Sequence, residues 1–131
     1  MALSPEHVQA TLDALRTGIR VRHLETSTAT AQEAAQSIGT VKGSIVKSLC
    51  FLVAGEPVIA LVAGDRKVND HALAAHYGVS RKQVRLADAE TTLRVTGYAP
   101  GGVPPIGHKQ PLPILIDASL GRFEVLYAAA G

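Results

Sequence analysis

The strongest constraint on this fold is one apolar stretch with a turn in its middle, residues 44–64 (SIVKSLCFLVAGEPVIALVAG). Two runs rich in apolar and β-branched residues flank Gly55-Glu56-Pro57, a pattern typical of two strands joined by a tight turn. Both runs are so apolar that both faces of the predicted hairpin should be buried. Because the chain has 131 residues and is 47% hydrophobic, we expect one globular domain over residues 1–131.

Helix-capping signals predict four short helices around this hairpin. Each begins at Ser, Thr, Asn or Asp and ends near a glycine, a residue that readily adopts the left-handed conformation that closes a helix. The predicted helices span about 5–17, 30–38, 69–78 and 88–95, and further strands are predicted at 19–24, 113–116 and 124–128. Helices and strands interleave without βαβ regularity, so we predict an α+β fold with a mixed, strongly curved sheet and flanking short helices.

Residues 97–113 (GYAPGGVPPIGHKQPLP) contain four glycines and five prolines, too many for a helix or strand. They lie between ordered segments, which predicts a loop of defined shape. At its centre is Gly101-Gly102-Val103-Pro104-Pro105. Glycines let a backbone approach a ligand closely and prolines stiffen it, so this loop could present fixed backbone dipoles to a small polar ligand. A purely structural turn explains the same residues.

Lys47 interrupts the most apolar predicted strand, where it shares the alternation face of Ile45, Leu49 and Phe51. A buried lysine without a partner costs several kcal/mol or loses part of its basicity. Strands therefore carry such a residue either at a functional cleft or as an edge residue that prevents aggregation. The residues alone leave both interpretations open.

Several classes of site are disfavoured. The single cysteine, Cys50, excludes an internal disulfide and a CxxC motif, and no histidine pair has metal-ligand spacing, so we predict no metal and no cofactor. The N-terminus does not resemble a signal peptide and no apolar run approaches membrane-spanning length. We therefore expect a cytoplasmic protein without a membrane partner. A net charge of +2 neither requires nor excludes a nucleic acid, whereas 4% aromatic residues disfavour a classical single-strand binding protein.

Several short motifs occur together in one order and spacing, and through them the chain resembles the YbaK family, also called the prolyl-tRNA synthetase associated domain. The resemblance covers about residues 30–131. It implies a barrel-like YbaK fold and a free-standing editing domain that hydrolyses the ester of mischarged tRNA, often tRNA for proline. The motifs are Val46-Lys47-Ser48-Leu49, Ala63-Gly64-Asp65 with Val68, Thr96-Gly97-Tyr98, the 101–105 loop and Leu115-Ile116-Asp117.

The resemblance also implies roles for particular residues. Lys47 matches the family's key lysine, residues 101–105 match its substrate loop, and Asp117 matches an aspartate near the pocket. The apolar neighbours of Lys47, including Leu49, would select the amino-acid side chain. No Ser-His-Asp or Cys-His set is visible, which favours substrate-assisted chemistry. A binding module that holds an aminoacyl end or nucleotide beside a tRNA synthetase, without catalysis, is the alternative.

Two features depart from the family. This chain has Ala129 where many members have a serine, and family chains usually continue through another strand and helix, whereas this one stops at Gly131. We therefore expect the domain to lack its C-terminal strand and helix.

The expected partner is the acceptor end of mischarged tRNA, together with an aminoacyl-tRNA synthetase. The phosphate contacts expected from the sequence are Lys42 and the short basic cluster that contains Arg81, Lys82 and Arg85. For that cluster, a solvated surface is the favoured explanation over phosphate contact.

Overall fold

The apolar stretch forms a long antiparallel hairpin in the computed structural model, which describes residues 2–24 and 30–131. Its strands are β1 (Ile45–Val53) and β2 (Glu56–Ala63). Ala54 and Gly55 between them both have positive φ angles, of 50° and 84°. That combination suits a two-residue turn whose twist matches the strands it joins. The predicted hairpin is confirmed.

Three short strands extend the hairpin into a mixed sheet. β3 (Val84–Leu86) pairs antiparallel with the end of β1, β5 (Tyr127–Ala128) pairs parallel with its start, and β4 (Ile114–Ile116) pairs parallel with β2. The order is β3-β1-β2-β4, with β5 also on β1. The predicted α+β fold and mixed sheet are confirmed. The sheet does not close into a barrel, because β3 and β4 lie at opposite edges and do not pair with each other.

The four predicted helices are confirmed. Three of them have the predicted caps: the side chains of Thr30, Asn69 and Asp88 each accept a hydrogen bond from a backbone N–H three residues later. The glycine that follows each of these three helices is left-handed. The helices are α1 (Pro5–Ala14), α2 (Ala31–Ile38), α3 (Asp70–Tyr77) and α4 (Ala89–Thr96), with short 3₁₀ turns at η1 (Lys42–Ser44), η2 (Arg81–Gln83) and η3 (Ala118–Arg122).

The strand predicted at residues 19–24 is wrong, and α1 ends three residues early. The chain turns at Arg16, whose φ is 55°, and then runs back along α1. The Gln9 side chain holds it there, because its amide accepts a hydrogen bond from Val21 N and donates one to Ile19 O. A helix side chain thus satisfies the backbone groups that a neighbouring strand would have paired.

One other strand prediction needs correction, and one strand was not predicted. The strand predicted at 124–128 pairs only over Tyr127–Ala128, and β3 was not predicted, because it lies within the basic cluster that has little apolar pattern. β3 is nevertheless a strand because Val84, Arg85 and Leu86 pair with Val53, Leu52 and Phe51 at the end of β1.

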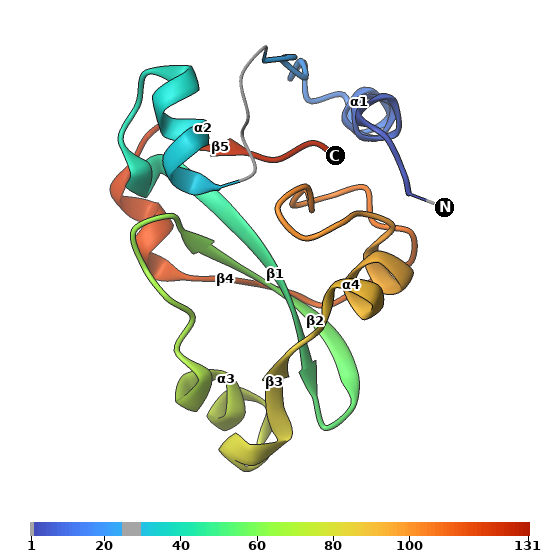
Figure 1. The fold of residues 1–131 in the computed structure, drawn as a ribbon, viewed down its shortest axis with the longest axis vertical. Coiled ribbons are helices and arrows are strands. Elements are labelled where there is room, and N and C mark those ends of the chain that lie inside the picture. Colours follow the sequence, from blue (N-terminus) through green and yellow to red (C-terminus); the bar gives the residue numbers. More distant parts are fainter. Residues whose placement is uncertain (1, 25–29) are drawn as a thin grey trace.

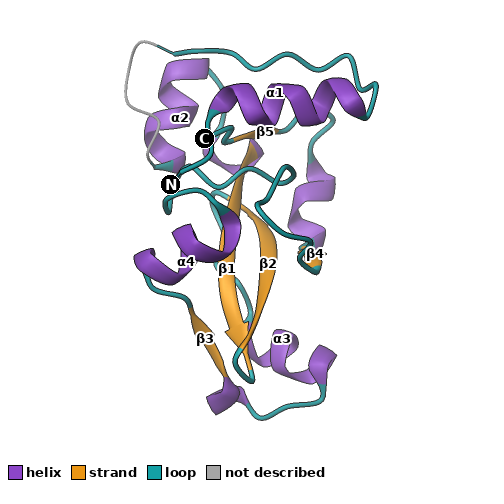
Figure 2. Ribbon diagram, turned by 90° about the vertical axis from the view of Figure 1, so that its right-hand side faces the viewer, coloured by secondary structure: helices purple, strands orange, loops and turns teal. Residues whose placement is uncertain are grey.

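The sheet lies between α3 on one face and α4 on the other (Figure 2). Side chains of β1 alternate between two cores. Val46 and Cys50 pack with residues from α4 and η3, and Phe51 and Val53 pack with residues of α3.

The other helices gather at the end of the hairpin where β1 begins. α1 packs against the glycine- and proline-rich loop through Val8, Tyr98 and Val103. α2 packs against Ile45 and Tyr127. α1, α2, β5 and the loop therefore surround one end of the sheet, while α3 and β3 lie at the other end (Figure 1).

Candidate functional site

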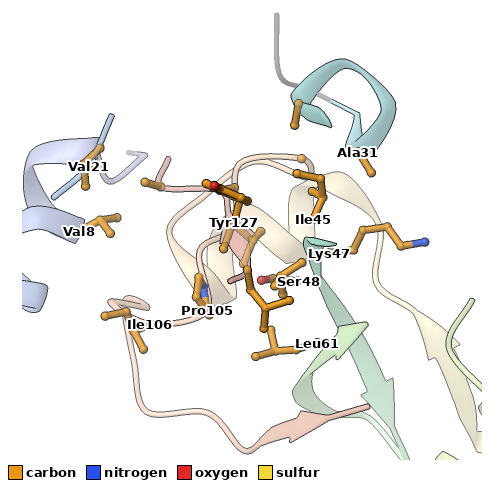
Figure 3. Close-up of a pocket in the computed structure, with 18 of the residues that line it drawn as sticks. Val8, Val21, Ala31, Ile45, Lys47, Ser48, Leu61, Pro105, Ile106 and Tyr127 are labelled. Atoms are coloured by element: carbon orange, nitrogen blue, oxygen red, sulfur yellow. The ribbon is translucent and has the colours of Figure 1, made fainter. Parts of the chain in front are cut away.

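A cavity of about 780 Å³ lies at the end of the sheet that α1 and α2 cover. Its volume falls within the range of about 300–1,000 Å³ that small-molecule sites occupy. The wall is mostly apolar, and its polar side chains include Arg20, Arg22, Thr30, Lys47 and Ser48. The apolar wall includes Val8, Leu12, Ala31, Ala34, Ile45, Leu61, Val103, Pro105, Ile106 and Leu126 (Figure 3).

The 101–105 loop forms one wall of the cavity. Gly101, Val103 and Pro105 line it. Gly102 and Pro104 are not among the lining residues; Pro104 is one of the fully buried side chains, and Gly102 O accepts a hydrogen bond of 2.9 Å from Gly131 N.

Hydrogen bonds hold the loop in one shape. The Tyr98 hydroxyl donates to Gly107 O at 2.8 Å, and His108 Nε2 donates to Pro104 O at 2.7 Å. Lys109 N donates to Thr96 O at 2.8 Å, which closes the base of the loop. Gly101 has a φ of 89°, which only glycine adopts readily. The loop is therefore a preorganised wall.

Ser48 is a polar group of the cavity wall that the sequence did not single out, because it lacks a nucleophile motif. It lies opposite Leu61 in the hairpin, and both residues line the cavity. The Ser48 side chain is buried, and its hydroxyl has no hydrogen-bond partner in the described part of the chain. A buried hydroxyl without a partner costs about 1–3 kcal/mol. The signal available in the sequence was its place next to Lys47 in an apolar strand.

Lys47 borders the cavity, but its side chain extends away from Ser48 and Leu61 (Figure 3). Its ammonium donates to Arg66 O at 2.6 Å. Partial burial is the main cause that lowers the pKa of Lys47, and Lys42 and Lys67 lower it further, while Asp65 raises it. The ammonium therefore lies among other cations at the edge of the cavity and not inside it.

The remaining site residues predicted from the sequence divide between the cavity and other places. Leu49 lines the cavity. Asp117 borders a smaller hollow of about 190 Å³ beside α3 instead, and its carboxylate accepts a hydrogen bond of 2.9 Å from Ser119 N. The Ser119 side chain is the main cause that lowers the pKa of Asp117, and the backbone bond lowers it further.

The basic cluster lies at the far end of the molecule from the cavity, where η2 and β3 adjoin α3 (Figure 1). Arg81 Nε pairs there with the Asp70 carboxylate at 3.1 Å. The structure thus brings Lys47, Leu49, Gly101, Val103 and Pro105 together, and it leaves Arg81, Lys82 and Arg85 apart from them.

Among the residues that the structure describes, no activated nucleophile is evident near this cavity. Burial raises the pKa of the Cys50 thiol, so this thiol ionises less readily than a free cysteine. The Ser44 hydroxyl is bound to Thr40 Oγ1 and Val41 O, and not to a histidine. Within residues 2–24 and 30–131, no three His, Cys, Asp or Glu side chains are grouped so that they could hold a metal ion. The same residues include no helix with the length and hydropathy needed to cross a membrane.

Comparison with known proteins places the chain in a family. Residues 25–131 match the aminoacyl-tRNA editing domain. The uncharacterized protein YwhH of Bacillus subtilis is 36% identical over 112 residues, which cover 85% of this chain and 69% of YwhH. A proline--tRNA ligase of Limosilactobacillus fermentum is 35% identical over 96 residues, covering 70% of this chain but only 16% of the ligase.

A solved structure supports the same relationship. It is described as "a putative trans-editing enzyme for prolyl tRNA synthetase" and superposes with a TM-score of 0.83 at 36% identity, covering 94% of this chain and 77% of that one. The similarity therefore extends over both sequence and fold. This protein belongs to the aminoacyl-tRNA editing domain family, which includes the YbaK proteins and is homologous to the insertion domains of prolyl-tRNA synthetases.

Proposed function

We propose that this protein is a trans-acting deacylase that hydrolyses the ester bond of mischarged tRNA, with tRNA for proline as the first candidate. The observation that supports this most is the apolar cavity between the preorganised 101–105 loop and the start of β1, in a chain of the editing family. The cavity has room for an amino-acid side chain and part of the terminal nucleoside. Since tRNA is charged and used in the cytoplasm, the proposal implies a cytoplasmic enzyme.

In this proposal the nucleophile is water, because residues 2–24 and 30–131 present no activated nucleophile at the cavity. In the proposed mechanism, a water oxygen attacks the ester carbonyl carbon and the bond from that carbon to the ribose oxygen breaks. The proton lost by the water ends on the ribose oxygen, so the products are a free amino acid and a tRNA with a free terminal hydroxyl. The neighbouring ribose hydroxyl is the nearest group able to orient the water or relay the proton, which makes the chemistry substrate-assisted.

The backbone of the 101–105 loop would hold the aminoacyl end. Gly101 has no Cβ, so its backbone groups can approach the ester or the ammonium closely. The hydrogen bonds from Tyr98 and His108 keep that backbone in place before the substrate arrives. Groups that are already oriented toward a developing charge need no reorganisation during the reaction, and such preorganisation is often a large part of catalysis.

Selection of the amino acid would rest on the apolar wall and on Ser48. An apolar pocket distinguishes one methylene by only about 1–3 kcal/mol, so we expect exclusion of large side chains rather than strict preference for one small residue. The unpartnered Ser48 hydroxyl would gain a hydrogen-bond partner when the aminoacyl group binds. Leu49 and Ile106 would form part of the apolar boundary.

Lys47 would act on the terminal phosphate. Its ammonium lies on the side of Arg66 and is directed away from the apolar wall, a position that favours contact with the phosphate over contact with the ester oxygen. The lysine would then position the last nucleotide so that the ester reaches the loop.

The test is a deacylation panel. The protein is incubated with tRNAs mischarged with different amino acids, in a buffer containing a metal chelator, and release of free amino acid is measured. The proposal expects release from at least one of them at a rate well above spontaneous hydrolysis. Stable binding of mischarged tRNA with no release from any of them would support the alternative, a binding module associated with a synthetase.

A further inference from the structure

A group of charged side chains from separate parts of the chain meets beside the cavity. It consists of five cations and two carboxylates: Lys42, Lys47, Arg66, Lys67 and Arg122, with Asp65 and Asp117. The charges of Lys42, Lys67 and Asp65 act on Lys47, and that of Asp117 acts on Arg122. Lys47 donates to Arg66 O, and Arg122 pairs with both oxygens of Asp65, at 2.7 and 3.1 Å. Arg66 Nε lies 3.8 Å from Asp65. We call this group the cationic cluster.

The cationic cluster carries more positive charge than the whole protein. Its five cations and two carboxylates leave an excess of three positive charges, whereas the chain has a net charge of +2. The rest of the chain is therefore slightly acidic, at −1. Lys42 and Lys67 are exposed and form no ion pair within the described residues. Like charges held together in this way repel, and an anion bound among them relieves the repulsion.

Two glycines allow the elements of the cluster to approach so closely. A Cβ on Gly43 would lie 2.9 Å from Asp65 Oδ2 and 2.9 Å from Phe123. A Cβ on Gly64 would overlap Lys42 O. The backbone near Lys42 thus packs directly against the segment after β2, which carries Arg66 and Lys67. The arrangement is built into the packing of η1, β2 and η3 and does not depend on flexible side chains alone.

We propose that the cationic cluster binds the backbone phosphates of the RNA strand that leads into the cavity. The inference rests on the proposed function, and it assigns the RNA surface to this end of the molecule. Lys47 belongs both to the cluster and to the cavity border, so it connects the two. A strand that enters the cavity with its last nucleotide would pass Lys47 first, and the preceding phosphates would lie near Lys42 and Lys67. The basic cluster at residues 81–85 lies at the opposite end and would not touch this strand.

Binding of an uncharged RNA tests the surface without requiring hydrolysis. The probe is a fluorescently labelled hairpin that reproduces a tRNA acceptor stem with its single-stranded 3′ end, and affinity is measured by fluorescence anisotropy over a range of KCl concentrations. The double variant Lys42→Glu/Lys67→Glu should bind at least tenfold more weakly. In Lys42→Ala/Lys67→Ala, loss of two phosphate contacts should flatten the slope of log affinity against log salt by about 1.4–1.8.

The control variant, Lys82→Glu/Arg85→Glu, makes the same change in charge in the basic cluster of residues 81–85. It should alter the RNA affinity less than twofold. Equal or greater weakening in that variant, or unchanged binding in both Glu variants, would overturn the proposal. Thermal melting confirms that each variant is folded. If the wild-type protein deacylates no tRNA, and Lys42→Glu/Lys67→Glu still weakens RNA binding, the proposed function is refuted and the RNA surface is supported. If the wild-type protein deacylates tRNA but Lys42→Glu/Lys67→Glu binds the RNA as tightly as wild type, the RNA surface is refuted and the proposed function is supported.

Discussion

Replacing Lys47 with methionine separates its contribution to stability from its contribution to the reaction. In the folded protein the ammonium makes a 2.6 Å hydrogen bond to Arg66 O, and a charged hydrogen bond contributes about 1.5–3 kcal/mol. Partial burial and the two nearby lysines oppose that gain, as the lowered pKa of Lys47 shows. The two effects offset each other, and methionine keeps the apolar length of the side chain. We therefore expect the free energy of unfolding to change by less than about 1 kcal/mol.

The effect on the reaction should be much larger. If the ammonium binds the terminal phosphate, its loss removes a charged interaction of about 1.5–3 kcal/mol. Because each 1.36 kcal/mol corresponds to a factor of ten in rate, kcat/KM on mischarged tRNA should fall about 10- to 150-fold. Lys47→Arg keeps the charge, but its planar guanidinium is larger and differs in geometry, so we expect it to fold and to be poorly active as well.

Two substrates identify the group that Lys47 contacts. Release of amino acid is measured from mischarged tRNA and from the same amino acid esterified to adenosine, which has no 5′ phosphate. If Lys47 binds the phosphate, Lys47→Met should lose activity on the tRNA and change less than about threefold on the nucleoside ester. An equal loss on both substrates would show that the ammonium acts at the ester. Normal deacylation of tRNA by Lys47→Met would refute any role of Lys47 in the reaction.

Three further predictions concern the loop, the cavity wall and an ion pair. Gly101→Ala should lower turnover and destabilise the fold by about 1 kcal/mol or more, because the φ of Gly101 is 89°. In Gly102→Ala the new Cβ meets only ordinary contacts at 3.4 Å and beyond. Thermal melts and deacylation rates should therefore show a larger loss in Gly101→Ala than in Gly102→Ala. Ser48→Ala should melt at a higher temperature because an unpartnered buried hydroxyl is lost, and its kcat/KM should be lower by about 2- to 10-fold. A hydrogen bond to the Arg122 guanidinium is the main cause that lowers the pKa of Asp65, so the ionised carboxylate stabilises the folded protein above its ordinary pKa and this stabilisation is lost as pH falls. The difference in melting temperature between wild type and Asp65→Asn should be present at neutral pH and close below about pH 4. A difference that widens in acid would contradict this sign.

Local sequence signals were sufficient for much of the fold. The hairpin follows from the apolar run and its turn, and three helices begin and end where their caps and glycines predict. These signals act between residues two to four apart, so the sequence contains them directly. The 101–105 loop was also predicted, because its glycines and prolines exclude regular structure wherever the loop lies.

The sequence determined less where a strand needed a distant partner. The alternation at residues 19–24 indicated a strand, but Gln9 of α1 satisfies this backbone instead. β3 was not predicted, because it is a strand only through its pairing with the end of β1.

Tertiary structure alone decided how the site is arranged. Alternation along β1 determined that Lys47 and Ser48 lie on opposite faces, but it could not tell that residues of both faces, such as Ser48 and Leu49, would line one cavity. Packing of α1, α2 and the loop against one end of the sheet made Ser48 a wall residue and turned the Lys47 ammonium toward Arg66. The same packing gathered Lys42, Lys67 and Arg122 beside it and left the basic cluster of residues 81–85 at the far end. The physical reason is that cavities and charge clusters form between segments far apart in the chain, whose relative positions depend on the packing of the whole domain.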